Sequence, residues 1–172
     1  MMGLDKDKNA VGDSKNFKYL NLLIHRGAKD IVLDSDIVLD DDEESKYKEG
    51  IKLDVDDFII DGNGHTIDAR AKTRIFDCTG KCITIKNIIL KNGFAESGGA
   101  IRNNGELCII DSSLTENAAW GPGGAIFNDY GKLTITGSTL SGNNADDGDY
   151  AGGAIFNNGG EITITGSTLS GN

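Results

Sequence analysis

The hexapeptide GGAIFN occupies Gly123–Asn128 and again Gly152–Asn157, and a variant, GGAIRN, occupies Gly98–Asn103. The last two copies are followed by a second repeated segment. KLTITGSTLSGN at Lys132–Asn143 matches EITITGSTLSGN at Glu161–Asn172 at ten of twelve positions. The chain is therefore built from a repeated unit, which predicts a solenoid rather than several independent domains.

Shorter versions of the same unit extend the repeat toward the N-terminus. Equivalent positions, 24 to 29 residues apart, open apolar segments at Phe58, Ile83, Leu107, Leu133 and Ile162. The segments LTIT, ITIT and CITI alternate with a period of two, and Gly-Asn turns separate them, so they are strands rather than helices. The unit predicts an all-β fold, a parallel β-helix in which successive coils are about 4.8 Å apart.

Stacking of equivalent coils predicts which side chains lie inside. The column of Ile101, Ile126 and Ile155 is assigned inward because the next position along the strand holds Arg102 in one repeat, and a lone arginine is rarely buried. The inward columns are Leu107, Leu133 and Ile162; Ile109, Ile135 and Ile164; Leu114, Leu140 and Leu169; and Ile101, Ile126 and Ile155. Two hydrogen-bonded ladders are expected along the turns, namely Asn103, Asn128 and Asn157, and Asn117, Asn143 and Asn172.

The N-terminal side has the pattern of a capped solenoid end. Residues 1–13 are polar and are expected to be disordered. Within residues 14–27, Ser14 is expected to cap a short helix from about Lys15 to Arg26 that covers the first coil. Residues 28–172 then form the β-helix, with early strands at Ile31–Leu33 and Ile37–Leu39 and a solvated acidic loop at Asp40–Glu44.

The charge of the chain argues against one class of partner. The 172 residues carry 17 basic and 27 acidic side chains, a formal net charge of −10, with no basic stripe. Nucleic acid and anionic membrane surfaces are therefore poor partners. No apolar stretch has the length of a transmembrane helix or the pattern of a signal peptide. The chain ends at Asn172 within a repeat, which predicts a truncated solenoid whose exposed C-terminal coil can associate with another copy.

A longer part of the sequence resembles a known family. The passage GIKLDVDDFIIDGNGHTIDARAKTRIF at Gly50–Phe76, followed by ITIKNIILKNG and the GGAI repeats, is similar to adhesin-like surface proteins of methanogenic archaea. The GGAI units also resemble those of chlamydial polymorphic outer-membrane proteins. The resemblance covers about residues 17–172. It implies a right-handed, single-stranded parallel β-helix of the pectate-lyase type, with about five or six coils, displayed at the cell surface or outside the cell. The family's secretion signal and anchor are not recognisable in these residues.

One passage suggests a catalytic interpretation. The segment from Asp61 to Asp68, DGNGHTID, places His65 and two carboxylates within eight residues. The same residues suit a tight turn between two strands, with Asp61 and Asn63 bonded to nearby amides, and this structural interpretation is preferred. His25, in the expected helix, has no evident acid–base partner.

Polysaccharide lyases and hydrolases with a β-helix fold are the main enzymatic alternative. Their sites need carboxylates, or a carboxylate with Arg or Lys, that converge from neighbouring coils. The outward charged candidates are scattered, namely Lys86, Arg102, Glu106, Asp111, Lys132 and Glu161. Glu106, Lys132 and Glu161 share one register, which is typical of charge pairing between exposed strands. No catalytic residue is therefore assigned.

No metal or cofactor site is assigned either. Asp146–Asp149 and Asp40–Glu44 contain loop carboxylates, but neither has the spacing of a known calcium motif, so solvated loops are the preferred interpretation. Cys78, Cys82 and Cys108 give no disulfide framework, because the repeat alignment separates Cys82 from Cys108 by about 8 Å.

Four aromatic residues form the candidate ligand-binding site, Trp120, Phe127, Tyr150 and Phe156. If the isoleucine before each phenylalanine points inward, Phe127 and Phe156 point outward and stack on adjacent coils. Trp120 and Tyr150 are expected at the same edge of that sheet, beside the insertion at Asn144–Ala151. Aromatic faces beside hydroxyl and amide groups bind sugars or protein partners. The alternative is that a further coil or a packed loop covers these rings.

These patterns together predict a non-enzymatic adhesion or interaction module. Its expected partner is a surface polysaccharide or a protein of another cell, and no cofactor is expected. A carbohydrate-processing β-helix is the second interpretation, and a rigid structural spacer is the third.

Overall fold

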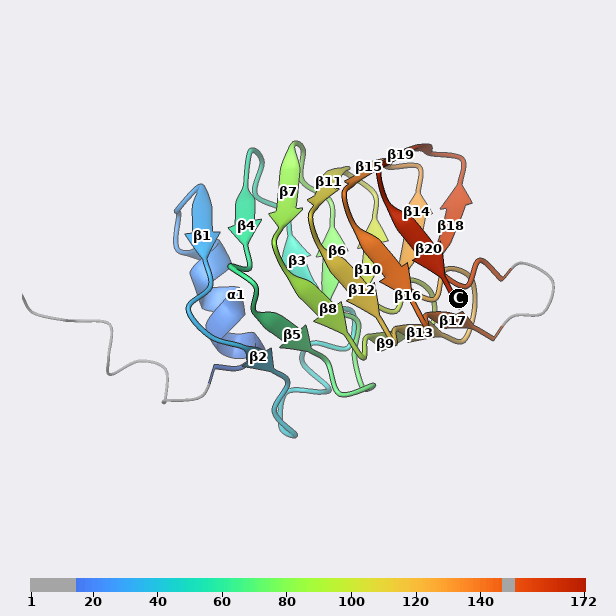
Figure 1. The fold of residues 1–172 in the computed structure, drawn as a ribbon. Helices are drawn as coiled ribbons and strands as arrows, with labels where there is room; N and C mark the ends of the chain where they lie inside the picture. Colours follow the sequence, from blue (N-terminus) through green and yellow to red (C-terminus); the bar gives the residue numbers. More distant parts are fainter. Residues whose placement is uncertain (1–14, 147–150) are drawn as a thin grey trace, which may run out of the picture.

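The computed structural model describes residues 15–146 and 151–172, which form a solenoid of parallel strands (Figure 1). It has about five turns. As the chain advances from left to right in Figure 1, the front strands run downward and the rear strands run upward, so the solenoid is right-handed. The all-β parallel fold and the N-terminal helix expected from the repeats are both confirmed.

Three long sheets and one short sheet run along the solenoid. Sheet A contains β1 (Asp30–Val32), β4 (Ile59–Asp61), β7 (Ile83–Lys86), β11 (Glu106–Ile110), β15 (Lys132–Thr136) and β19 (Glu161–Thr165). Sheet B contains β2 (Ile37–Val38), β5 (Thr66–Asp68), β8 (Ile89–Lys91), β12 (Ser113–Thr115), β16 (Thr139–Ser141) and β20 (Thr168–Ser170). Sheet C contains β3 (Ile51–Leu53), β6 (Phe76–Cys78), β10 (Ile101–Asn103), β14 (Ile126–Asp129) and β18 (Ile155–Asn158). The short sheet D contains β9 (Phe94–Ala95), β13 (Ala118–Ala119) and β17 (Asn144–Ala145).

The strand register confirms the predicted repeat unit. Leu107 pairs with Ile83 on one side and with Leu133 on the other, and Leu133 pairs with Ile162. The shorter unit that Phe58 opens follows the same register, because the amide of Thr84 donates a backbone hydrogen bond of 2.8 Å to the carbonyl of Phe58. The early strands expected at Ile31–Leu33 and Ile37–Leu39 are present as β1, which pairs with β4, and β2, which pairs with β5.

The predicted inward columns form the core. Ile101, Ile109, Ile126 and Ile135 are fully buried, and Leu107 is 1% exposed. The exception is the last coil, where Ile164 is 41% and Leu169 is 44% exposed. Their equivalents one coil earlier are fully buried because another coil covers them, and in the last coil the same side chains line a shallow apolar hollow.

Both predicted asparagine ladders are present. The side-chain amide of Asn103 donates to Asn128 Oδ1 at 2.7 Å, and the amide of Asn128 donates to Asn157 Oδ1 at 2.7 Å. The second ladder runs from Asn117 through Asn143 to Asn172, with bonds of 3.0 and 2.8 Å. These amides keep adjacent turns at a constant spacing, because the side-chain NH2 group of each buried asparagine needs the side-chain oxygen of the asparagine in the next coil as its acceptor.

The N-terminal helix differs from its predicted boundaries. Helix α1 spans Phe17–His25 and is capped by Asn16, whose Oδ1 accepts from the amide of Tyr19 at 3.0 Å. Ser14, the expected cap, lies outside the described residues, as does the segment 1–13. The expected apolar face is present, since Phe17, Leu20 and Ile24 are fully buried, and the helix packs against β2 and β3. Within the described residues no helix has the length and apolar character needed to cross a membrane.

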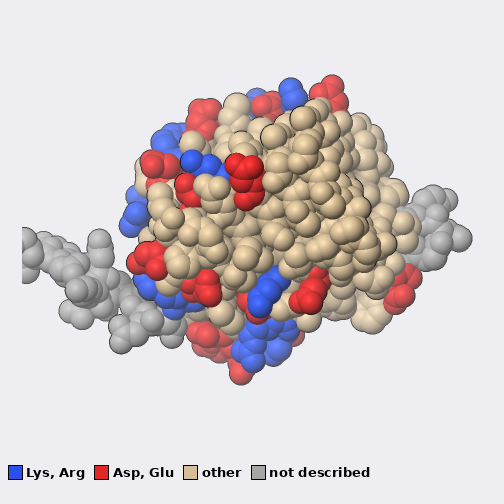
Figure 2. Space-filling model, in the orientation of Figure 1, with Lys and Arg blue, Asp and Glu red and all other residues tan. Residues whose placement is uncertain are grey.

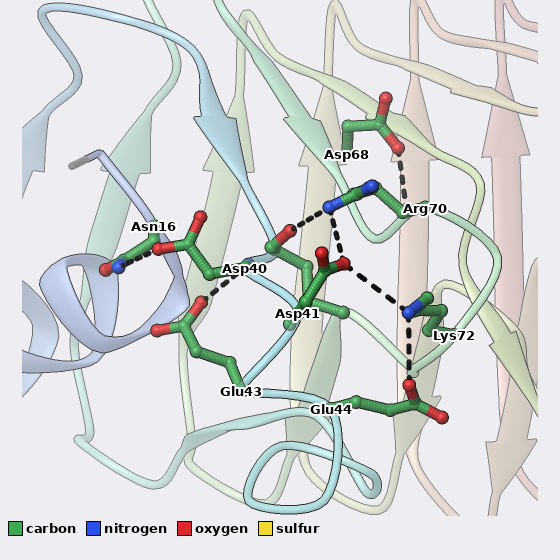
Figure 3. Close-up of polar contacts among 9 residues, drawn as sticks. Asn16, Asp40, Asp41, Glu43, Glu44, Asp68, Arg70 and Lys72 are labelled. Carbon is green, nitrogen blue, oxygen red and sulfur yellow. Dashed lines mark hydrogen bonds and ion pairs between the residues drawn. The ribbon is translucent and has the colours of Figure 1, made fainter.

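The acidic run Asp40–Glu44 was predicted to be a solvated loop, and this is wrong for Glu43. Its side chain is buried, and its two carboxylate oxygens accept from the backbone amides of Phe17 and Lys18 at 3.1 and 2.7 Å. Glu43 thereby satisfies free amides at the positive end of the helix. Asp40 is anchored in the same way, because its Oδ2 accepts from Asn16 at 2.6 Å (Figure 3).

Asp41 and Glu44 of the acidic run are exposed but paired. Asp41 contacts Arg70 at 2.9 Å and Lys72 at 3.5 Å, and Glu44 contacts Lys72 at 3.3 Å (Figure 3). The loop therefore joins the helix on one side to the turn after β5 on the other. These contacts could not be predicted from the sequence, because the partners are 24 to 31 residues apart.

A buried arginine was also not predicted. The Arg74 side chain is 3% exposed, and its guanidinium donates to the carbonyls of Gly98, Ser97 and Glu49 and to the Glu49 carboxylate at 2.9 to 3.1 Å. It is stable inside because carbonyls of the turns above and below replace water around its N–H groups. Arg102, in contrast, points outward as expected and is 40% exposed.

Candidate ligand-binding face

The outer surface of sheet C changes character along the solenoid. One outward column crosses all five strands in register, in the order Lys52, Asp77, Arg102, Phe127 and Phe156. Their strand neighbours point into the core, because side chains alternate between the two faces of a strand. The column is charged in the first three strands and aromatic in the last two. We call the part of this surface around Arg102, Phe127 and Phe156 the sheet C face.

The two phenylalanines stack as predicted. Their ring centroids are 5.8 Å apart with an interplanar angle of 15°. Both side chains are half-buried, so one surface of the pair remains open to solvent. The stack follows directly from the repeat, since GGAIFN places an outward phenylalanine at the same point of each coil.

A polar network adjoins this stack. Arg102 Nη2 lies 2.8 Å from Asp129 Oδ2, and the same carboxylate accepts from the side-chain amides of Asn104 at 3.1 Å and Asn158 at 2.9 Å. Asp129 is only 15% exposed. The hydrogen bond from Arg102 lowers the pKa of Asp129 below its usual value, with further bonds from Asn158 and Asn104 acting in the same direction against partial burial. The same bond raises the pKa of Arg102.

Tyr130 extends the aromatic character of this region. It follows Asp129 at the turn after β14, has a φ of 58° and is 75% exposed. Its ring lies against Gly159 of the next coil, where a Cβ atom would meet Tyr130 Cε1 at 2.8 Å. Glycine is therefore required there both for its φ of 74° and for the space that the ring takes.

Trp120 belongs to a different aromatic pair. It is 64% exposed and packs edge-to-face on Phe94 of the preceding coil, with ring centroids 5.4 Å apart. Within residues 15–146 and 151–172, no ring contact joins Trp120 to Phe127 or Phe156. Tyr150, the fourth predicted site residue, lies outside the described residues. The structure thus brings two of the four predicted residues together and places a third on Phe94.

The polar half of the site was missed by the sequence analysis. Arg102 was used to assign the inward column and counted among the scattered outward charges, and Asp129, Asn104 and Asn158 were not singled out. The pairing of Asp129 with Asn158 in adjacent strands was a usable signal, because both positions follow the repeated asparagine of the GGAIFN unit. Arg102 and Asp129 are 27 residues apart in the chain and meet diagonally across β10 and β14, because Arg102 pairs with Phe127, two residues before Asp129.

The DGNGH turn has the structure that was preferred for it. The amide of Asn63 donates to Asp61 Oδ1 at 2.9 Å, and the amide of His65 donates to the carbonyl of Gly62 at 2.8 Å. A Cβ at Gly62 would lie 2.5 Å from the Ile88 side chain, which explains this glycine. His65 Nδ1 is 3.3 Å from Asp36 in the coil below, and Asp61 is paired with Lys86 at 3.3 Å.

The expectation for His25 is wrong. Its Nε2 lies 3.1 Å from Asp54 Oδ1, so it does have a carboxylate partner, while Nδ1 is 2.8 Å from the carbonyl of Asn21. The contact joins the end of α1 to the loop after β3 and is exposed. Its position on the capping helix gives it a bridging role between the helix and the first coils.

The three cysteines do not form disulfides with one another. Cys78, Cys82 and Cys108 are all free. Burial raises the pKa of the Cys78 thiol to about 12, so it remains protonated and is not a nucleophile. In the part of the chain that the structure describes, no group of three or more His, Cys, Asp or Glu side chains could hold a metal ion. Most of Asp146–Asp149 lies outside that part.

Comparison of the chain with protein-family models, with curated proteins and with solved structures finds no match. The site is therefore interpreted from its own geometry.

Proposed function

We propose that this chain is a non-catalytic binding module that holds a carbohydrate chain on the sheet C face. The observation that carries the proposal is the stacked pair of Phe127 and Phe156 directly beside the network of Arg102 and Asp129. By the resemblance to surface adhesins, we place the module at the cell surface, where its partner is a polysaccharide of another cell.

The chemistry of the sheet C face suits a sugar. The apolar surface of a sugar ring packs on an aromatic face, and its hydroxyls bond to amide, guanidinium and carboxylate groups. Phe127 and Phe156 supply the first kind of contact, and Arg102, Asn104 and Asn158 supply the second. The face is open and crosses several coils, which favours an extended chain over a small molecule enclosed in a pocket.

The ionisation of the polar network supports binding rather than acid–base catalysis. A general acid needs a pKa near the working pH, whereas the pKa of Asp129 is lowered, and that carboxylate already accepts three side-chain hydrogen bonds. A carbohydrate-processing activity is the second candidate. It is favoured by the position of Asp77 between Lys52 and Arg102 in the outward column, where opposite charges from three coils come together.

The test is binding of soluble neutral and acidic oligosaccharides from plant and microbial walls, screened on an array and measured by calorimetry for those that bind. We expect Phe156→Ala to weaken binding about tenfold, in line with the loss of one aromatic contact. The matched control is Trp120→Ala, which removes a more exposed ring at another corner of the solenoid and should change affinity less than about twofold.

Four outcomes would contradict the proposal. Absence of binding to all tested oligosaccharides would contradict it, and so would equal losses of oligosaccharide affinity in Phe156→Ala and Trp120→Ala. Release of new reducing ends or unsaturated products would replace it with the carbohydrate-processing alternative. Binding of a purified cell-surface protein alone, with the sugars inert, would keep the face as a site but overturn its ligand class.

A further inference from the structure

A second surface of the solenoid carries hydroxyl groups in a regular array. In β15 the outward positions after Lys132 hold Thr134 and Thr136, and in β19 the paired positions hold Thr163 and Thr165. In sheet B, the outward positions of β12, β16 and β20 are also all Ser or Thr. We call the outward Ser and Thr residues of these five strands the Ser/Thr face.

The Ser/Thr face is free of charge, unlike the same columns in the earlier coils. There, the outward positions of sheets A and B hold the ion pairs Lys86–Asp61 and Lys91–Asp68, at 3.3 and 3.4 Å. Figure 2 shows the result as a broad tan area over β15, β16, β19 and β20, with charged groups gathered at its borders and on the N-terminal coils. The area faces away from the sheet C face, which lies at the back of Figure 1.

The hydroxyls of this face are available to a ligand. The serines at the bends between sheets A and B use their hydroxyls internally, since Ser112, Ser138 and Ser167 each donate to a carbonyl two residues earlier at 2.7 to 3.0 Å. No such internal side-chain hydrogen bond involves the Ser/Thr face within residues 15–146 and 151–172. Most of its residues in β15, β16, β19 and β20 are exposed.

The array is also rigid and periodic. Each Thr of β15 lies beside its equivalent in β19, so the spacing is about 4.8 Å between strands and about 6.7 Å between outward residues of one strand. Threonine has a branched Cβ and few rotamers, so its hydroxyl and methyl groups are held in place before a ligand arrives. Lys and Glu would cover the surface with mobile charged groups, and within these five strands they occur only as Lys132 and Glu161, at one border of the face.

From this arrangement we infer that the Ser/Thr face binds the ordered surface of an uncharged, hydroxyl-rich polymer, a packed neutral polysaccharide. A hydroxyl both donates and accepts, so an array of hydroxyls is complementary to another such array. A single bond of this kind contributes little in water, and the contact becomes strong only when many form at once. A flexible polymer chain would lose conformational entropy when it is ordered on the face, and that loss would offset the many hydrogen bonds. A rigid, periodic surface is ordered before it binds and keeps their full effect. This site goes beyond the sheet C face and does not depend on it.

The experiment measures depletion of the protein from solution by microcrystalline cellulose and by chitin, at moderate salt. We expect the wild-type chain to partition onto at least one of them. Thr134→Val with Thr163→Val keeps the branched shape and removes two neighbouring hydroxyls, and it should lower the partition coefficient about fivefold. Thr134→Lys with Thr163→Lys should reduce it further, because each lysine places a hydrated charge in the contact.

The control variant is Trp120→Ala, which alters an exposed ring outside both faces and should leave partition onto the solids unchanged. Circular dichroism of each variant checks that the fold is retained. Loss of partition in Phe156→Ala but not in the threonine variants would overturn the inference. Failure of the wild-type chain to bind either solid would also overturn the inference. The same holds if the wild-type chain instead shapes growing ice crystals or forms dimers through this face.

Discussion

Ile135 and Lys132 show how strongly the alternation of side chains determines the effect of a substitution. Ile135 is fully buried in the column between Ile109 and Ile164, whereas Lys132, three residues earlier, is exposed. We expect Ile135→Asp to lower the free energy of unfolding by at least about 4 kcal/mol, because it buries a carboxylate without a partner. Lys132→Ala should change it by less than about 0.5 kcal/mol. Urea denaturation measures both, and equal shifts would mean that the inward and outward assignments are wrong.

Asp129 makes stability depend on pH at the residue scale. Its folded-state pKa lies below the usual value of 3.8, so its network stabilises the fold fully above about pH 4 and progressively less as the pH falls through the folded-state pKa. We expect Asp129→Asn to cost about 1 kcal/mol at pH 7, given the partial exposure of Arg102. The difference from wild type should shrink as the pH falls below about 4 and through the folded-state pKa of Asp129. A difference that is independent of pH would show that the carboxylate charge plays no part.

At the scale of elements, helix α1 depends on a loop that follows it in the chain. Glu43 accepts from two amides of its first turn, and the helix itself has no acidic residue there. We expect Glu43→Gln to destabilise the chain by about 1–2 kcal/mol, since a neutral amide replaces a carboxylate at the positive end of the helix. The matched control is Glu44→Gln, the same change at a 51% exposed side chain with one ion pair to Lys72, which should cost less than about 0.5 kcal/mol. Thermal unfolding followed by circular dichroism compares them, and a larger loss for Glu44→Gln would refute the capping role.

At the scale of the whole molecule, each coil is stable because the next coil covers it. Among the residues that the structure describes, no coil covers the one formed by β18, β19 and β20, and the hydrogen-bond ladder predicts which of its amides are unpaired in the 172-residue chain. In β15 and β19 the amides of Lys132 and Glu161 bond to the preceding coil, so by the alternation of a parallel ladder those of Ile162 and Ile164 point to the open edge. Hydrogen exchange should therefore be fast at Ile162 and Ile164, slower at Thr163 and Thr165, and slowest at Ile83 and Ile85.

The concentration dependence of the same measurement tests self-association. If copies pair through the edges of β18, β19 and β20, protection of Ile162 and Ile164 will rise with protein concentration while that of Ile83 stays constant. Uniform protection of every coil at high dilution would show instead that this edge is not open in solution.

The repeat unit alone determined the solenoid, its register, its inward columns and both asparagine ladders. These features follow from local rules, because a side chain on a strand alternates between two faces and equivalent residues of equal coils must stack. The phenylalanine stack was predictable for the same reason, since Phe127 and Phe156 hold equivalent positions in neighbouring coils.

Only the tertiary structure decided the contacts between residues that are not equivalent. Glu43 reaches the start of α1, Arg74 donates to turns of the neighbouring coils, and Arg102 bonds to Asp129 diagonally across the paired strands β10 and β14. Each partner is 23 to 27 residues away, but none holds the equivalent position of the repeat. Charge patterns do not reveal such pairs, because the energy of a buried charge depends on which donors or acceptors the fold brings to it. The apolar core and the asparagine ladders of this protein could therefore be predicted from its repeats, whereas its charged contacts depended on how neighbouring coils pack against one another.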